Sequence, residues 1–201
     1  MATVDPLLPL SLLEAVRVVD TPDDLDAEFV AELRNKRLGL SDTVYQQIRR
    51  WTDAVKRSQR GAHEEAVALA RLIGRRPDAE AVFRAAGRYL ARELYETVPQ
   101  FWRRAMLVLP SFIARPMALR RARRIVRRHL DGDLGRVGGQ LLLRVQDSVT
   151  LDTAPRAAGC AYYEACLREL LRLMVDVQGA VEHVKCAARG EGVDEWLAEW
   201  R

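Results

Sequence analysis

The chain has 201 residues and a formal net charge of +4, from 32 Lys and Arg residues against 28 Asp and Glu residues. Hydrophobic residues make up 49% of the chain and charged residues 30%, which is typical of a folded domain and argues against a disordered one. The sequence has no apolar run of the roughly 20 residues that a membrane span needs, no basic start of a signal peptide and, with three cysteines, no paired disulfide framework.

The first two thirds of the sequence have the apolar spacing of helices. A proline and two acids directly after Thr21 predict a helix start, and this helix is expected to end near Lys36. Ser41 should cap the next helix, in which apolar residues recur every three or four positions from Val44 to Val55.

Prolines divide the part of the chain that follows. A helix is predicted over about 63–73, and Pro77 opens another one. Pro99, Pro110 and Pro116 should bend or break the next stretch, because proline removes a helical hydrogen bond. The last helix of this group is predicted to begin after Pro116.

The last third of the sequence mixes strand and helix patterns. Residues 141–146 have the alternation of a strand, with a turn expected at 147–148 and a second strand after it. Residues 161–174 are again helical, and residues 180–200 predict two strands around the glycines of 190–192. This order predicts an α+β fold, in which a helix-rich N-terminal two thirds packs on a small antiparallel sheet.

A motif near the C-terminus connects these elements. Cys160 opens the helix that begins with two tyrosines, and Cys186 and Gly190 form a Cys-x-x-x-Gly strand and turn. Trp196 follows two residues after Asp194. The glycine supplies the positive φ that a tight turn between strands needs, so the motif has a structural explanation of its own.

This motif resembles that of the 4-vinyl reductase (V4R) domain family, which shares its fold with the Bet3-like vesicle-tethering subunits. The helical segment around Gly87 is similar to the Ala-Gly-Arg segment of that family. Asp194 stands where the family has its last cysteine, and His183 stands where the family often has an acid. The resemblance implies a Bet3/V4R-like domain over residues 75–201, with residues 1–74 as an N-terminal helical extension.

The resemblance also implies a function. It predicts a non-catalytic sensory or scaffolding module in the cytoplasm that acts as a homodimer or with a protein partner. A small, largely apolar ligand would bind between the helices and the sheet, and no cofactor is expected. The candidate ligand-binding residues are Phe83, Gly87, Leu90, Tyr162, Tyr163 and Cys166.

A metal site would need three or four ligands that converge. Cys160 and Cys166 are six positions apart on a helix and point in different directions. His183 and Cys186 are three apart on a strand and should face opposite sides. The sheet could still bring Cys160, Cys186 and Asp194 together, and some relatives of this fold bind metal there. Thiols that pack as small hydrophobes are the preferred interpretation, so no metal is expected.

The strongest charge feature is a helix with arginines on its outer side. Six arginines and His129 lie within ten residues that hold no acid. The arginines are Arg120, Arg121, Arg123, Arg124, Arg127 and Arg128. A solvated surface is the simplest interpretation, and the alternative is a basic-surface adaptor that docks on anionic membrane or nucleic acid. Nucleic acid is disfavoured, because no aromatic residue lies among these arginines.

Motifs of the common enzyme classes are missing from the sequence. It has no phosphate-binding loop, no dinucleotide-binding glycine motif, no nucleophile elbow and no zinc-protease motif. The Tyr-x-Ser-x-Arg run of haem-binding relatives is missing too. A tetrapyrrole-handling enzyme of the reductase type is therefore only a further alternative, and a non-catalytic role is preferred.

Overall fold

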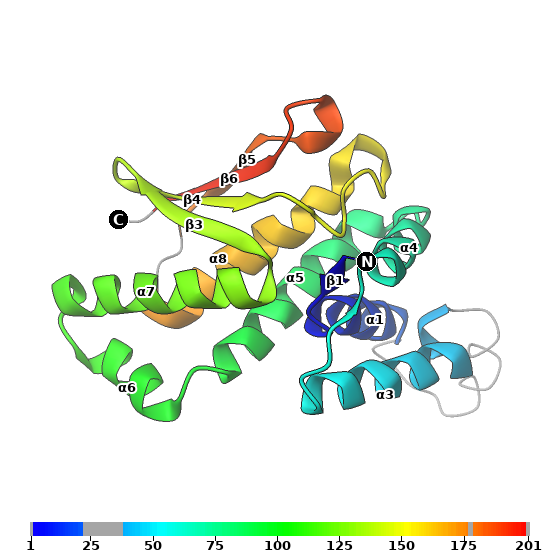
Figure 1. Ribbon diagram of the computed structural model, residues 1–201, viewed down its shortest axis with the longest axis horizontal. Helices are drawn as coiled ribbons and strands as arrows, with labels where there is room; N and C mark the ends of the chain where they lie inside the picture. The colour runs from blue at the N-terminus through cyan, green and yellow to red at the C-terminus, as the bar shows by residue number, and fades with distance from the viewer. Residues whose placement is uncertain (1, 22–37, 177–178, 200–201) are drawn as a thin grey trace.

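The computed structural model describes residues 2–21, 38–176 and 179–199 (Figure 1). Its first two thirds contain the helices α1 (Leu7–Asp20), α3 (Asp42–Lys56), α4 (His63–Gly74), α5 (Ala79–Glu96), α6 (Gln100–Val108) and α7 (Ser111–His129), with the short strands β1 (Thr3–Val4) and β2 (Gly61–Ala62). Its last third contains β3 (Gly132–Val137), β4 (Gln140–Val145), α8 (Ala161–Val175), β5 (Val181–Lys185) and β6 (Asp194–Glu199). The fold is α+β, as the sequence predicts. The helix predicted over 21–36 lies, from residue 22 onward, outside the described residues.

The larger sheet is antiparallel throughout and has the strand order β3-β4-β6-β5. β3 contacts α7, while β5 and β6 contact α8, so helices cover one face of the sheet (Figure 1). The turn predicted between β5 and β6 is confirmed, since Gly190 has a φ of +83° there. The sheet thereby holds the C-terminal hairpin against α8.

The sequence patterns missed one strand and predicted another wrongly. No strand was predicted over β3, because two glycines and two charged residues give it little strand propensity. The hairpin turn lies at Gly138, which has a φ of +59°. The strand predicted after residue 148 is a turn, in which Ser148 Oγ accepts a hydrogen bond from the Thr150 amide at 3.3 Å. This local hydrogen bond competes with strand pairing.

A capping serine and two prolines mark the starts of three helices. Ser41 caps α3 by accepting a hydrogen bond from the Val44 amide at 3.4 Å, as predicted. Pro99 and Pro110 directly precede α6 and α7. Pro116 was expected to precede the next helix, but it lies within α7, near the helix start. Among the residues that the structure describes, every helix falls short of the length and hydrophobicity needed to cross a bilayer.

The core is centred on the contact between α5 and α8. A Cβ atom added to Gly87 in the middle of α5 would lie 2.1 Å from the carbonyl oxygen of Tyr162 in α8. Ion pairs flank this close approach, with Arg84 2.8 Å from Glu164 and Arg92 3.2 Å from Glu169. Glycine is therefore needed where the two helix backbones meet.

The helix α1 packs on α5 and is almost entirely buried. The sequence patterns predicted no element here, because the leucines of Leu7–Asp20 follow one another without helical spacing and Pro9 lies among them. Its buried side chains belong to the same core cluster as those of α5, α8 and the larger sheet. The first twenty residues thus contribute to the centre of the fold.

Candidate metal centre

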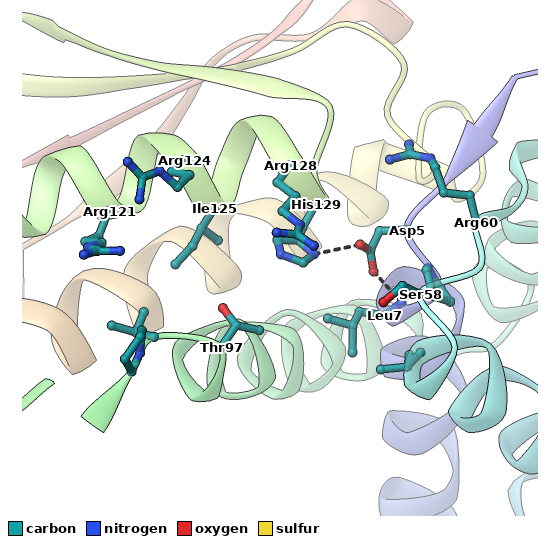
Figure 2. A pocket seen from close by; sticks show the side chains of 14 residues that line it. Asp5, Leu7, Ser58, Arg60, Thr97, Arg121, Arg124, Ile125, Arg128 and His129 are labelled. Carbon is teal, nitrogen blue, oxygen red and sulfur yellow. Dashed lines mark hydrogen bonds and ion pairs between the residues drawn. The ribbon is translucent and has the colours of Figure 1, made fainter. Parts of the chain in front are cut away.

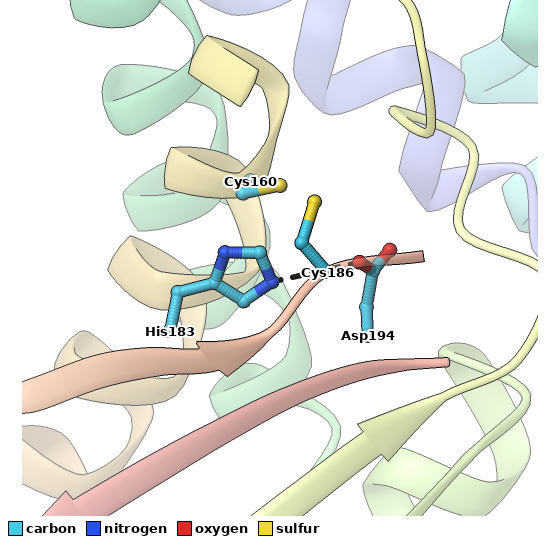
Figure 3. A group of neighbouring side chains, drawn as sticks. All are labelled: Cys160, His183, Cys186 and Asp194. Atoms are coloured by element: carbon cyan, nitrogen blue, oxygen red, sulfur yellow. Dashed lines mark ion pairs between the residues drawn. The ribbon is translucent and has the colours of Figure 1, made fainter. Parts of the chain in front are cut away.

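Four potential metal ligands meet between the start of α8 and the β5–β6 hairpin (Figure 3). The donor atoms of Cys160, His183, Cys186 and Asp194 all lie within 4.8 Å of one another. Cys160 directly precedes α8, His183 lies in β5, Cys186 follows β5, and Asp194 begins β6. The cluster therefore joins one end of a helix to both strands of a hairpin.

A bulge in β5 makes this convergence possible. The pairing of β5 with β6 shifts between His183 and Lys185, so that Val184 is an extra residue in the strand. An extra residue interrupts the alternation of side chains along a strand. The prediction that His183 and Cys186 face opposite sides is therefore wrong, and both side chains reach the same site (Figure 3).

The imidazole of His183 has a buried nitrogen that fits a metal ion. Its Nε2 is shielded from solvent and has no hydrogen-bond partner among the described residues. The same atom lies 3.5 Å from Oδ1 of Asp194, whose side chain is 1% exposed. The ring stacks on Trp196 with 4.8 Å between centroids, and the Ala187 amide donates a hydrogen bond to Asp194 Oδ1 at 2.9 Å. These contacts orient both donors, as the surroundings of metal ligands commonly do.

The two thiols lie in surroundings that favour a cation. Cys186 is buried and Cys160 is half-buried. Burial raises the pKa of the Cys160 thiol to about 12, and the neighbouring Asp194 carboxylate and Cys186 thiol contribute to the rise. A bound metal ion reverses this preference, since a thiol that coordinates a metal loses its proton. Without a cation the Cys160 thiol is protonated, and with one both thiols can act as ligands.

The donor set suits zinc. Zinc is bound by thiolate, imidazole and carboxylate, most often by four ligands in a tetrahedron. Donors at about 2.0–2.3 Å from a tetrahedral ion are roughly 3.3–3.8 Å apart. The separations here, which reach 4.8 Å, would need to contract by about 1 Å. Side-chain rotation of this size needs no change in the fold, so the four residues fit a zinc ion.

A cavity of about 470 Å³ opens beside the two thiols. Its walls come from the turn before α8, from the 3-10 helix Pro155–Cys160, and from the loop after β5. Besides Cys160 and Cys186, it is lined by Thr150, Leu151, Asp152, Ala154, Pro155, Ala157 and Arg189. The candidate metal centre is therefore next to a space that is large enough for a small molecule.

The residues predicted to bind an apolar ligand come together in the core. Phe83, Gly87, Leu90, Tyr162, Tyr163 and Cys166 are all buried at the contact of α5 with α8. The Tyr162 hydroxyl is 2.8 Å from Ser11 Oγ, and the Tyr163 hydroxyl accepts a hydrogen bond from the Val149 amide at 3.3 Å. Burial raises the pKa of both hydroxyls, so the tyrosines remain neutral and anchor neighbouring segments. None of these six residues lines the cavity beside the thiols, and a ligand between these helices stays a prediction.

The predicted basic residues of α7 divide into two groups. Arg123 donates a hydrogen bond to the Leu134 carbonyl at 2.8 Å, and Arg127 lies 3.1 Å from Asp133. The guanidinium of Arg121 stacks on Trp102 at 4.7 Å from its centroid. The remaining three form no ion pair with a described residue; they are Arg120, Arg124 and Arg128. These three arginines are thus available to bind an anion.

Two functional features are not evident from the sequence patterns. His183 belongs to the ligand cluster, and the only sequence signal for it is its position, at which 4-vinyl reductase domains often have an acid. The basic segment extends beyond residues 120–129, because no acid occurs from Thr97 to Leu130. Comparison of the chain with protein-family models, curated proteins and solved structures finds no match.

Proposed function

We propose that the chain is a non-catalytic zinc-binding module in which one zinc ion ties the β5–β6 hairpin to the start of α8. The convergence of Cys160, His183, Cys186 and Asp194 supports this proposal. Four protein donors complete a tetrahedral site and leave no position for a substrate, which is typical of structural zinc sites. The resemblance to 4-vinyl reductase domains agrees with it, since Cys160, Cys186 and Asp194 occupy the family's cysteine positions.

A sensory role follows from the neighbouring cavity. A small molecule bound in it would touch Cys160, Cys186 and the residues that precede α8. The zinc ion would connect those residues to both strands of the hairpin, so that binding changes the contacts of β5 and β6. A bound molecule would in this way alter the exposed edge of the sheet, where a protein partner could detect the change.

Metal analysis tests the zinc proposal. We expect the purified chain, incubated with Zn²⁺ and desalted, to retain one zinc per chain by mass spectrometry of the metal. Replacing a thiolate ligand in Cys186→Ser should weaken zinc binding by about 100-fold or more, because even residues that only orient ligands cost 10–100-fold. With Co²⁺ in place of Zn²⁺, the wild-type chain should show a thiolate-to-cobalt absorption band that is clearly weaker in the variant, which keeps only the Cys160 thiol in the cluster.

The third cysteine provides the matched control. Cys166 is buried in the core and lies outside the ligand cluster, so Cys166→Ala should still bind one zinc per chain. Equal zinc retention by wild type and Cys186→Ser would contradict the proposal. A wild-type chain that keeps no zinc under these conditions would contradict it too.

A second candidate function is docking on an anionic membrane. The turn between α6 and α7 exposes three apolar side chains, with Val108 85%, Phe112 75% and Ile113 40% exposed. Nine arginines and no acid occur from Thr97 to Leu130, the segment that contains this turn. Apolar side chains beside cations are the pattern of helices that lie in the membrane interface. The exposed apolar residues favour a lipid surface over nucleic acid.

Vesicle sedimentation tests the docking function. We expect the chain to bind phosphatidylglycerol vesicles and not phosphatidylcholine vesicles at low salt. The double variant Val108→Ser/Phe112→Ser should bind at least about tenfold more weakly, because each apolar side chain that is buried contributes about 1.5–3 kcal/mol. The control Val18→Ser removes an apolar side chain that is 62% exposed on α1 and should bind like wild type. Failure to bind anionic vesicles, or equal binding by the double variant, would refute docking at this turn.

A further inference from the structure

A second cavity, of about 710 Å³, lies below α7 on the side that faces the N-terminal segment (Figure 2). Its walls come from four parts of the chain: the segment before α1, the end of α3 with the loop after it, the connection between α5 and α6, and α7. None of these parts contributes a ligand to the candidate zinc site. The two sites therefore use different elements and can be tested separately.

The lining of this cavity is strongly cationic. Arg60, Arg121, Arg124 and Arg128 line it, and Asp5 is the only acid among the lining residues. Asp5 is already engaged, since its Oδ2 lies 2.7 Å from Nδ1 of His129. The cavity is thus lined by four arginines and by one carboxylate that has a partner.

Two of the cavity arginines have no partner of their own. Arg60 forms an ion pair with Asp131, and Arg121 stacks on Trp102. Arg124 and Arg128 form no ion pair with a described residue. They are four positions apart on α7, so they lie on one face of the helix, one turn apart. An anion between them would relieve the repulsion of two like charges.

The cavity also has an apolar floor. Leu7, Val98 and Ile125 line it, and each of these side chains is buried. In Figure 2 the side chains of Ile125 and His129 extend from α7 into the space above Thr97 and Leu7, while the Arg124 side chain lies over the α7 ribbon. An apolar chain in the cavity would contact this floor. An apolar molecule without a charged group would leave Arg124 and Arg128 without an ion-pair partner.

We propose that this cavity binds a small amphipathic anion, namely a carboxylate or phosphate group on an apolar chain. The anionic group would lie between Arg124 and Arg128, because guanidinium groups match the oxygens of carboxylate and phosphate in paired hydrogen bonds. The apolar chain would lie on Leu7, Val98 and Ile125. The volume of about 710 Å³ falls within the roughly 300–1,000 Å³ of ligand pockets.

Calorimetric titration with defined amphiphiles tests the proposal. The probes are decanoate and decyl phosphate below their micelle concentrations, with decanol and inorganic phosphate as partial probes. We expect one decanoate or decyl phosphate per chain, with binding that weakens as salt increases. The double variant Arg124→Gln/Arg128→Gln should bind the better probe about 10- to 100-fold more weakly, since it removes two charge-assisted contacts. Stronger binding of decanoate would indicate a fatty-acid type of ligand, and stronger binding of decyl phosphate a lipid-phosphate type.

The same helix supplies the control. Arg127 pairs with Asp133 and does not line the cavity, so Arg127→Gln should bind like wild type. Because Arg124 and Arg128 form no ion pair, the double variant should also unfold at the same temperature as wild type; if it does not, the single variant Arg124→Gln replaces it. Equal binding of decanol and decanoate, binding of phosphate as strong as that of decyl phosphate, or unchanged binding by the variant would each overturn the proposal.

Discussion

Removal of zinc from the loaded chain is expected to lower the midpoint of thermal unfolding by roughly 8–16 °C. A ligand present at 1,000 times its dissociation constant stabilises the folded state by about 4 kcal/mol. In a domain of 150–250 residues, each kcal/mol shifts the midpoint by about 2–4 °C. Calorimetry of the zinc-loaded chain and of the same chain after treatment with a chelator measures the difference.

The loss of stability on zinc removal should be localised as well as large. Zinc ties Cys160 to ligands on both strands of the β5–β6 hairpin, and α5, α8 and α1 form the core without it. Hydrogen exchange should therefore speed up most at the amides of residues 181–185 and 194–199 after chelation. In Cys186→Ser, zinc at the same concentration should shift the midpoint by less than half as much as in the wild type, because a site weakened about 100-fold is exposed to only about ten times its dissociation constant. If the chelator leaves the midpoint of thermal unfolding of the wild-type chain unchanged, no metal stabilises this fold.

Gly87→Ala is expected to destabilise the chain by about 2–3 kcal/mol, although alanine is the better helix former by about 1 kcal/mol. The new methyl carbon would lie 2.1 Å from the Tyr162 carbonyl oxygen and 2.9 Å from the Cys166 amide nitrogen. Both atoms belong to the backbone of α8, which cannot rotate away as a side chain would. The two helices must separate, and the core loses contacts along both. Urea unfolding of the two chains gives the difference in free energy.

The outcome at Gly87 also bears on the apolar-ligand hypothesis. A pocket between α5 and α8 needs space between these helices, and in that case the alanine variant would unfold like wild type. Gly139 provides a control, because a Cβ added there meets no atom within 4 Å and its φ is not positive. Gly139→Ala should change the stability by less than about 0.5 kcal/mol. Equal stability of all three chains would contradict the close packing of α5 on α8.

Local signals in the sequence predicted much of the fold. The cap at Ser41 and the turn at Gly190 depend on single residues whose chemistry decides the backbone, and both are confirmed. The strand β3 and the helix Leu7–Asp20 could not be predicted in this way. Glycines lower the strand propensity of β3, and the continuous apolar run of Leu7–Asp20 hides its helical spacing. Both elements therefore depend on their tertiary contacts.

The candidate site was predictable only in part, for a related reason. The resemblance to 4-vinyl reductase domains implied that Cys160, Cys186 and Asp194 could meet, and they do lie together, although thiols packed as hydrophobes were the preferred interpretation. His183 was excluded by the strict alternation of a regular strand. The shift in pairing that brings it into the site arises between β5 and β6, and the sequence of β5 alone does not record it. The arginine cavity likewise depends on Asp5 and Arg60 lying beside α7, far from it in the chain.

The extra residue in β5 affects how this region can change during evolution. The direction of each donor is set by the backbone, so one donor type can replace another at positions 183 and 194 without rebuilding the hairpin. A change in length has a defined effect. Deletion of Val184 would place His183 and Cys186 two positions apart in a regular strand, on the same face, so that the two donors would still meet without the bulge. Related chains should therefore vary in the identity of these ligands, and these two donors should lie three positions apart with a bulge or two positions apart without one.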